Sequence, residues 1–252
     1  NPRLLIKIAT LLLALCISTQ SFSQAWNTVG NGLPNGPSPV EVLVTASDTT
    51  GVYVVIRELV ASLYSPISLM KWNGLAWSTL ALPPVQLPYY HFYPHDIAIV
   101  GGNIYVCGIM TGAPKSTIYK YDGNSWSTIA PPNLNGQINK LAVVNGELIC
   151  GGDFTANTNI ENLMRYDGIT FHAYPHIPWM TSVRDILELN GELYISGTSP
   201  GLVTPMDSNL LKLNTLNVWE GPAQFSQATG GTAYGYTLSE YQNSLILIEA
   251  KN

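Results

Sequence analysis

An internal repeat of about 45 to 50 residues constrains the fold of this chain more than any other feature. Four segments share an apolar residue, a base, an aromatic residue or leucine, and then Asn or Asp. They are MKWNGLAW from Met70, YKYDGNSW from Tyr119, MRYDGITF from Met164 and LKLNTLNVW from Leu211. A chain with such a period is an array of similar supersecondary units, because each unit needs its neighbours to bury its apolar surface.

Each unit predicts four strands. GGNIYVCG from Gly101, NGELICGG from Asn145 and NGELYISG from Asn190 align between the first segments, and each is preceded by a short run rich in Ile, Leu and Val. Short runs of this kind bounded by Asn-Gly or Asp-Gly are typical of strands joined by tight hairpins, in which these residues supply positive φ angles. Asp122 and Asp167 are therefore interpreted as turn formers.

The predicted fold is all-β, a β-propeller of four-stranded antiparallel blades with about five blades represented. One such sheet cannot bury both faces alone, whereas sheets stacked around an axis can. A hydrophobic content of 46% with 22 Gly and 17 Pro suits a turn-rich all-β chain. The expected blades span residues 40–82, 95–130, 138–175, 183–223 and, in part, 235–252, with 26–34 as a closing outer strand. Since the fifth unit stops after two strands, we expect a propeller truncated at its C-terminus.

Residues 1–25 are interpreted as a signal peptide. Arg3 and Lys7 are followed by an apolar stretch from Ile8 to Ile17, which is too short to span a bilayer, and small residues surround Gln24. The alternative is a buried N-terminal element, and lipidation of Cys16 stays open. We expect a secreted or cell-surface protein with no membrane insertion after cleavage. A net charge of −5 disfavours nucleic acid as a partner.

The repeat resembles the kelch-like, galactose-oxidase-type propeller proteins. The resemblance is strongest in the third unit, where the pair Gly151-Gly152 is followed by Tyr166 and Phe171. The combination of GGDFT, YDG and a large aromatic residue is also similar to propellers secreted by Bacteroidota. The resemblance covers about residues 40–223 and implies a fold rather than an activity, because propellers host many unrelated functions.

Cys107 and Cys150 both fall in predicted strands, at phases that differ by one residue. Their side chains are therefore expected on opposite faces of the sheets. We expect two buried free thiols rather than a disulfide.

One end of the propeller is the expected ligand-binding face. Strand direction alternates within a blade, so the connections between blades and the loops between the second and third strands share one end. All four histidines are placed in these loops, beside several aromatic residues that suit stacking on sugars. The candidate ligand-binding residues are His91, Tyr93, His95, Asp96, Lys140, His172, Tyr174, His176, Trp179 and Asp185.

Asp96, Lys140 and Asp185 occupy equivalent positions at the start of the first strand of their units. A ring of mixed charge could orient a polar ligand at the channel mouth, but solvated charges at strand ends are the favoured interpretation. The pairs His91/His95 and His172/His176 have a spacing that chelates metal on a helix, which the prolines before each second histidine disfavour. We expect no metal, no cofactor and no catalytic residue.

The sequence therefore favours an extracellular, non-enzymatic binding module whose partner is a glycan or an extracellular protein. The alternative is a carbohydrate-active hydrolase or lyase with its site at the channel mouth. That alternative requires a converging carboxylate pair, for which Asp96 and Asp185 are the candidates.

Overall fold

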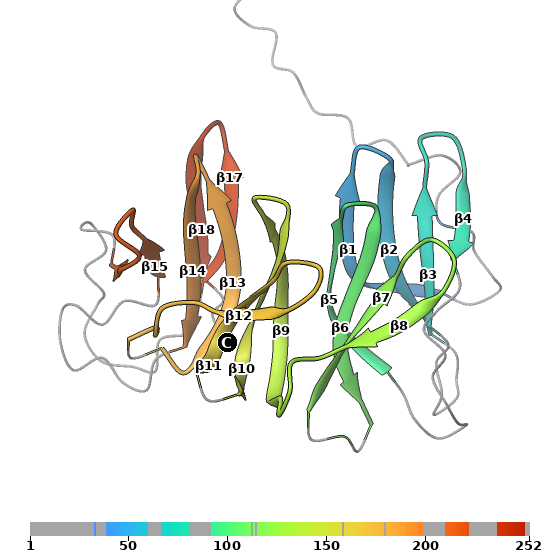
Figure 1. Ribbon diagram of the computed structural model, residues 1–252. Helices are drawn as coiled ribbons and strands as arrows, with labels where there is room; N and C mark the ends of the chain where they lie inside the picture. Colours follow the sequence, from blue (N-terminus) through green and yellow to red (C-terminus); the bar gives the residue numbers. More distant parts are fainter. Residues whose placement is uncertain are drawn as a thin grey trace, which may run out of the picture. The chain divides into compact units, whose positions relative to one another are not determined.

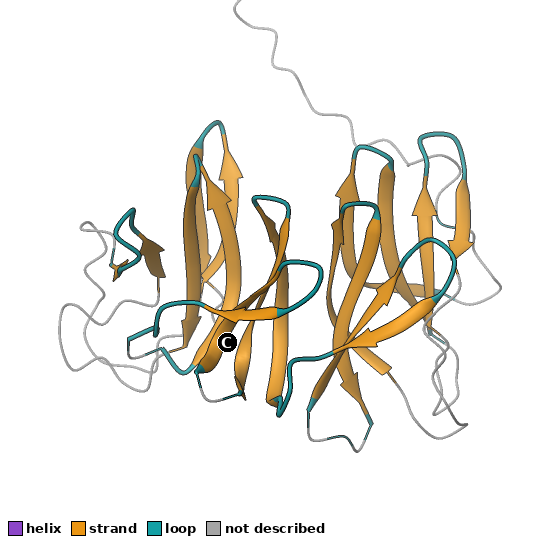
Figure 2. Cartoon of the chain, in the orientation of Figure 1, coloured by secondary structure: helices purple, strands orange, loops and turns teal. Residues whose placement is uncertain are grey.

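The described part of the computed structural model consists of strands, turns and loops, with no helix (Figure 2). The described residues are 33, 39–59, 67–80, 92–111, 113, 115–157, 159–178, 180–198, 210–221 and 236–249. The expected signal peptide, its lipidation candidate Cys16 and the expected closing strand, apart from Leu33, lie outside this range. No described residue belongs to a helix long and apolar enough to cross a bilayer.

Four antiparallel sheets of four strands and one of two strands follow each other along the chain (Figure 1). Within every sheet the strands pair in sequence order. The first strands of the second and third sheets start at Phe92 and Asn135, before the starts expected at 95 and 138. The sheets comprise β1 (Val40–Asp48), β2 (Gly51–Glu58), β3 (Ile67–Trp72), β4 (Trp77–Leu80); β5 (Phe92–Val100), β6 (Asn103–Met110), β7 (Ser116–Tyr121), β8 (Trp126–Ile129); β9 (Asn135–Val144), β10 (Glu147–Ala156), β11 (Ile160–Tyr166), β12 (Phe171–Ala173); β13 (Ser182–Leu189), β14 (Glu192–Thr198), β15 (Leu210–Leu213), β16 (Trp219–Glu220); and β17 (Tyr236–Tyr241), β18 (Ser244–Glu249).

Neighbouring sheets pack through their first strands. β1 contacts β5, β5 contacts β9, β9 contacts β13 and β13 contacts β17. Apolar side chains fill the layers between the sheets, for example Ile138 and Met164 between the second and third, and Ile149 and Ile195 between the third and fourth. This succession of four-stranded antiparallel blades, with the first strand of each packed on the first strand of the next, confirms the predicted all-β propeller class.

A β-bulge interrupts the first strand of each four-stranded sheet at the same place. In the second, third and fourth sheets a glycine of the neighbouring strand lies beside the bulge, at Gly108, Gly152 and Gly197. A Cβ at any of these glycines would overlap a backbone carbonyl oxygen of the bulged strand. The repeated glycine of the sequence motif is therefore a consequence of the bulge.

The outer hairpins, which join the third and fourth strands, are fixed by one side chain each. Asp122 Oδ1 accepts hydrogen bonds from the N–H groups of Asn124 and Ser125 at 2.9 and 2.8 Å, and Asp167 Oδ1 does the same for Ile169 and Thr170 at 2.8 Å. Both aspartates act as the turn formers that the sequence predicts. Positive φ is found at the following glycine and not at the aspartate, whereas at Asn145-Gly146 both residues have positive φ.

Cys107 and Cys150 are free and fully buried, as expected. Both belong to the same apolar layer between the second and third sheets. Cys107 points from the second sheet toward the third, and Cys150 points from the third sheet toward the second. The two side chains use opposite faces of their sheets, as the one-residue difference in phase predicts, and so they meet in the same layer. Burial raises the pKa of both thiols.

Candidate functional site

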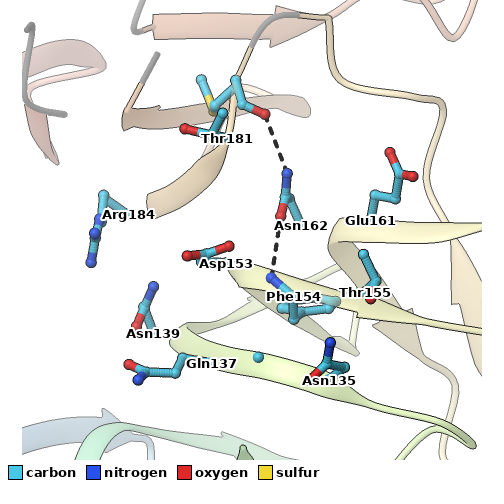
Figure 3. A pocket seen from close by; sticks show the side chains of 12 residues that line it. Asn135, Gln137, Asn139, Asp153, Phe154, Thr155, Glu161, Asn162, Thr181 and Arg184 are labelled. Atoms are coloured by element: carbon cyan, nitrogen blue, oxygen red, sulfur yellow. Dashed lines mark hydrogen bonds between the residues drawn. The ribbon is translucent and has the colours of Figure 1, made fainter. Parts of the chain in front are cut away.

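A polar cavity of about 600 Å³ opens between the third and fourth sheets. Four segments line it: the start of β9, the end of β10, the start of β11, and the start of β13 with the two residues before it. All four lie at the end of the sheets where the sequence places the ligand-binding face. The lining residues are Asn135, Gly136, Gln137, Asn139, Asp153, Phe154, Thr155, Glu161, Asn162, Met180, Thr181 and Arg184 (Figure 3).

Two of the lining side chains come from the bulges. The strand register skips Asn139 in β9 and Arg184 in β13, which leaves each as the extra residue of its bulge. A bulge re-aims the side chain that it inserts. The bulges, which require a glycine in the neighbouring strand, thus also direct the amide of Asn139 and the guanidinium of Arg184 into the cavity.

Asn162 holds the inner wall of the cavity together. Its Oδ1 accepts a hydrogen bond from the Phe154 N–H at 3.2 Å, and its Nδ2 donates to the Met180 carbonyl oxygen at 3.2 Å (Figure 3). The residue has a φ of 59°, which asparagine tolerates better than most residues. The side chain occupies a break in the pairing of β10 with β11 and links the third sheet to the segment before β13.

The cavity combines one cation, two carboxylates and several neutral hydrogen-bonding groups. Figure 3 shows Arg184, Asp153 and Asn139 on one side, with Glu161 on the other. Because Asp153, Glu161 and Arg184 are all exposed, their charges are solvated and available to a ligand. Amides and carboxylates at this density suit a ligand rich in hydroxyl groups, which both donates and accepts hydrogen bonds.

Asp96, Lys140 and Asp185 lie together, but they bind each other rather than solvent. The Lys140 Nζ lies 3.3 Å from Asp96 Oδ2 and 3.2 Å from Asp185 Oδ1. Asp96 Oδ2 also accepts from the Leu141 N–H at 2.9 Å. Asp185 Oδ2 accepts from the Leu238 N–H at 2.7 Å. Each aspartate therefore ties its own sheet to the backbone of the next, and the expectation of solvated charges is wrong for these two buried carboxylates.

The protonation of this group follows from burial and pairing. Burial raises the pKa of Asp96, although Lys140 and the backbone N–H donors oppose the shift. Burial lowers the pKa of Lys140, but its two carboxylate partners outweigh burial and leave that pKa raised. The bridge through one ammonium places Asp96 and Asp185 within the roughly 10 Å expected of a glycosidase pair. Since all four oxygens accept hydrogen bonds from the protein, these carboxylates have a structural role.

Of the three described histidines, His176 lies in a connection between sheets as predicted, whereas His95 and His172 lie within strands. His95 lies within β5, where its Nδ1 is 2.8 Å from the Ile138 carbonyl oxygen. His172 lies within β12, with Nε2 2.7 Å from Asp167 Oδ2, beside an outer hairpin at the opposite end of the sheet. His176 follows β12, and its Nδ1 lies 3.4 Å from Glu161 Oε2. His91 lies outside the described residues.

The aromatic candidates also separate. Tyr93 is 46% exposed on β5. Tyr174 is half-buried against Trp219, with ring centroids 6.4 Å apart, and burial raises its pKa to about 12. Tyr174 and His176 line a smaller cavity of about 370 Å³ that shares Glu161 with the larger one. Trp179 lies outside the described residues.

The residues that line the cavity of about 600 Å³ were not predicted from the sequence. One signal could have found two of them, because His95, Asn139 and Arg184 are equivalent polar residues that each precede the aligned charges. Asp153, Glu161 and Asn162 carry no such signal, since their convergence depends on the break between β10 and β11.

Among the described residues, no three His, Cys, Asp or Glu side chains are grouped to hold a metal ion.

No protein-family model matches the chain. No curated protein matches it either. Among solved structures, the chain is similar to the high-resolution structure of a novel alpha-L-arabinofuranosidase (CtGH43) from Clostridium thermocellum ATCC 27405. The TM-score is 0.39 and the identity is 12%, with 91% of this chain and 84% of that chain covered. A likeness at this level carries no argument about function.

Proposed function

We propose that this chain is an extracellular, kelch-like propeller module that binds carbohydrate in the cavity between the third and fourth sheets. The observation that carries the proposal is the lining of that cavity, in which the side-chain amides of Asn135, Gln137 and Asn139 lie with Arg184 and two carboxylates. Sugar hydroxyls pair with such groups, and a volume of about 600 Å³ falls in the usual range of small-molecule sites. The extracellular location rests on the signal peptide expected at residues 1–25.

A glycan array followed by calorimetric titration of the best ligand tests binding. Arg184→Ala removes the only cation among the described lining residues, and we expect at least a tenfold loss of affinity. Asn124→Ala changes an exposed side chain of an outer hairpin, at the opposite end of a sheet, and serves as the matched control. Equal affinities of the wild type and Arg184→Ala for every ligand found on the array would refute this site.

A carbohydrate-active hydrolase is the second candidate, and one observation favours it. Asp153 and Glu161 are exposed carboxylates that line the same cavity. Most glycoside hydrolases use a pair of carboxyl groups, one on either side of the scissile bond, as their catalytic groups. This pair replaces Asp96 and Asp185, whose oxygens are bound within the protein.

Mass spectrometry of oligosaccharides incubated with the protein separates the two candidates. A binding module leaves the oligosaccharides intact. A hydrolase shortens them, and both Asp153→Asn and Glu161→Gln then abolish the shortening while the fold is retained. Turnover that survives both substitutions would place the chemistry elsewhere in the molecule.

A further inference from the structure

Two more cavities adjoin the cavity of about 600 Å³ on the third sheet. The cavity of about 370 Å³ shares Glu161 with it. A cavity of about 750 Å³ shares Asn159 and Ala173 with the smaller one. Each cavity therefore shares lining residues with the next, and the series runs from the boundary with the fourth sheet to the outermost strand of the third sheet.

The outer two cavities repeat the chemistry of the first. Asn133, Asn157 and Asn159 supply amides. Each of the two outer cavities also has one half-buried aromatic residue, Tyr174 in the cavity of about 370 Å³ and Phe171 in the cavity of about 750 Å³. Both rings are partly exposed. Tyr174 packs on the layer between the third and fourth sheets, and Phe171 packs on the layer between the second and third. Tyr174 rests on Trp219, and the Phe171 ring centroid lies 4.7 Å from that of Tyr166.

A backbone hydrogen bond links the segments that carry Asn133 and Asn157. The Asn157 N–H donates to the Pro132 carbonyl oxygen at 3.1 Å, which joins the turn between β10 and β11 to the connection between β8 and β9. Asn133 and Asn157 both have positive φ, at 56° and 49°. A fixed lining lowers the entropic cost of binding.

We propose that the three cavities form one track, which binds a linear, uncharged oligosaccharide of several sugar units; this inference rests on the proposed function. Each cavity has the volume of a small-ligand site, so their succession suits a chain of linked units rather than one compact molecule. All three residues of the outermost strand β12 line the last cavity, so the track reaches the edge of the sheet. A polymer can therefore extend beyond it, which fits recognition of an internal stretch of chain.

The charges of the track favour an uncharged sugar polymer over a charged one. Asp153 and Glu161 lie with Arg184 in the first cavity, and Arg165 lies in the outermost one. Arg165 is already paired with Glu147 at 2.7 Å, which leaves little unpaired positive charge for a polyanion. Recognition then depends on amide hydrogen bonds and ring stacking.

Affinity as a function of chain length tests the track. The probes are β-1,4-linked glucose, mannose and xylose oligomers of one to six units, together with whichever sugar the glycan array identifies, titrated into the full chain. We expect affinity for the preferred sugar to rise at least tenfold from the dimer to the hexamer. A flat length dependence overturns the track and leaves the proposed function standing, whereas a blank array together with no binding of any oligomer overturns both.

Two substitutions locate the outer part of the track. Asn159→Ala changes an exposed turn residue shared by the outer cavities, and it should weaken hexamer binding about tenfold while dimer binding stays unchanged. Glu161→Gln lies at the junction with the first cavity and should weaken both. Asn124→Ala is again the control. If Asn159→Ala leaves the hexamer affinity unchanged, the ligand does not cross the third sheet.

Discussion

At position 152 the need for glycine comes from the neighbouring strand and not from the backbone conformation of Gly152 itself. It has no positive φ in the structure, yet a Cβ there would overlap the Gln137 carbonyl oxygen. The same relation holds between Gly108 and Tyr93, and between Gly197 and Ser182. The requirement is therefore steric and comes from the bulged strand.

Gly152→Ala tests this relation. The added methyl group must displace backbone, so we expect the free energy of unfolding to fall by about 1–3 kcal/mol or more. Gly146→Asn is the control, because nothing lies within 4 Å of its would-be Cβ and asparagine tolerates positive φ. Urea denaturation measures both, and equal losses for the two variants would contradict a steric origin.

At the level of an element, the outer hairpins are also closed by side-chain contacts. Asn73 and Asn214 accept hydrogen bonds from backbone N–H groups of their turns, as Asp122 and Asp167 do in the other two hairpins. Either residue type closes the turn, but only aspartate adds a charge. Hydrogen bonds from the Thr170 N–H, His172 and the Ile169 N–H hold the pKa of Asp167 well below its ordinary value of 3.8.

This depressed pKa predicts a pH dependence. A carboxyl group whose pKa is lower in the folded state stabilises the fold above its ordinary pKa, and the contribution is lost as the pH falls toward the folded value. Asp167→Asn keeps the turn and removes the charge. The difference in unfolding free energy between wild type and variant should be constant above about pH 5 and shrink below pH 3.8. For Asp122→Asn, the difference in unfolding free energy should also shrink as the pH falls, because the pKa of Asp122 is lowered as well. A difference in unfolding free energy that does not change with pH would exclude the charge as its source.

Elements were more predictable from the sequence than the candidate site. Asn-Gly and Asp-Gly turns and short β-branched runs are local signals, so the strands around Asn145 and Asn190 follow directly from them. The position of His172 illustrates the limit, because a shift of a few residues relative to the hairpin moves a side chain from one end of a sheet to the other. The cavity depends on bulges and on a break in strand pairing, which are properties of two strands together.

At the level of the whole molecule, Asp96 and Asp185 join successive sheets by accepting hydrogen bonds from backbone N–H groups, in addition to the apolar packing between the sheets. Asp185→Ala removes the acceptor of the Leu238 N–H. A buried donor without a partner costs about 1–3 kcal/mol, so we expect a loss of stability in this range. Hydrogen exchange of residues 236–241 should accelerate most at Leu238.

Glu240→Ala provides the comparison for this experiment, because Glu240 is an exposed side chain on the same strand. Its exchange pattern should match that of the wild type. If Asp185→Ala leaves the exchange at Leu238 unchanged, apolar packing alone joins the fourth and fifth sheets.

The links made by Asp96 and Asp185 have a direction, because each carboxylate reaches the sheet that comes next in the chain and none of these bonds skips a sheet. Interactions between nearest neighbours let a repeat protein fold unit by unit. A nascent chain that emerges N-terminus first can therefore dock each completed sheet on one that is already folded. Such vectorial assembly shortens the time for which a half-made array exposes apolar layers to aggregation.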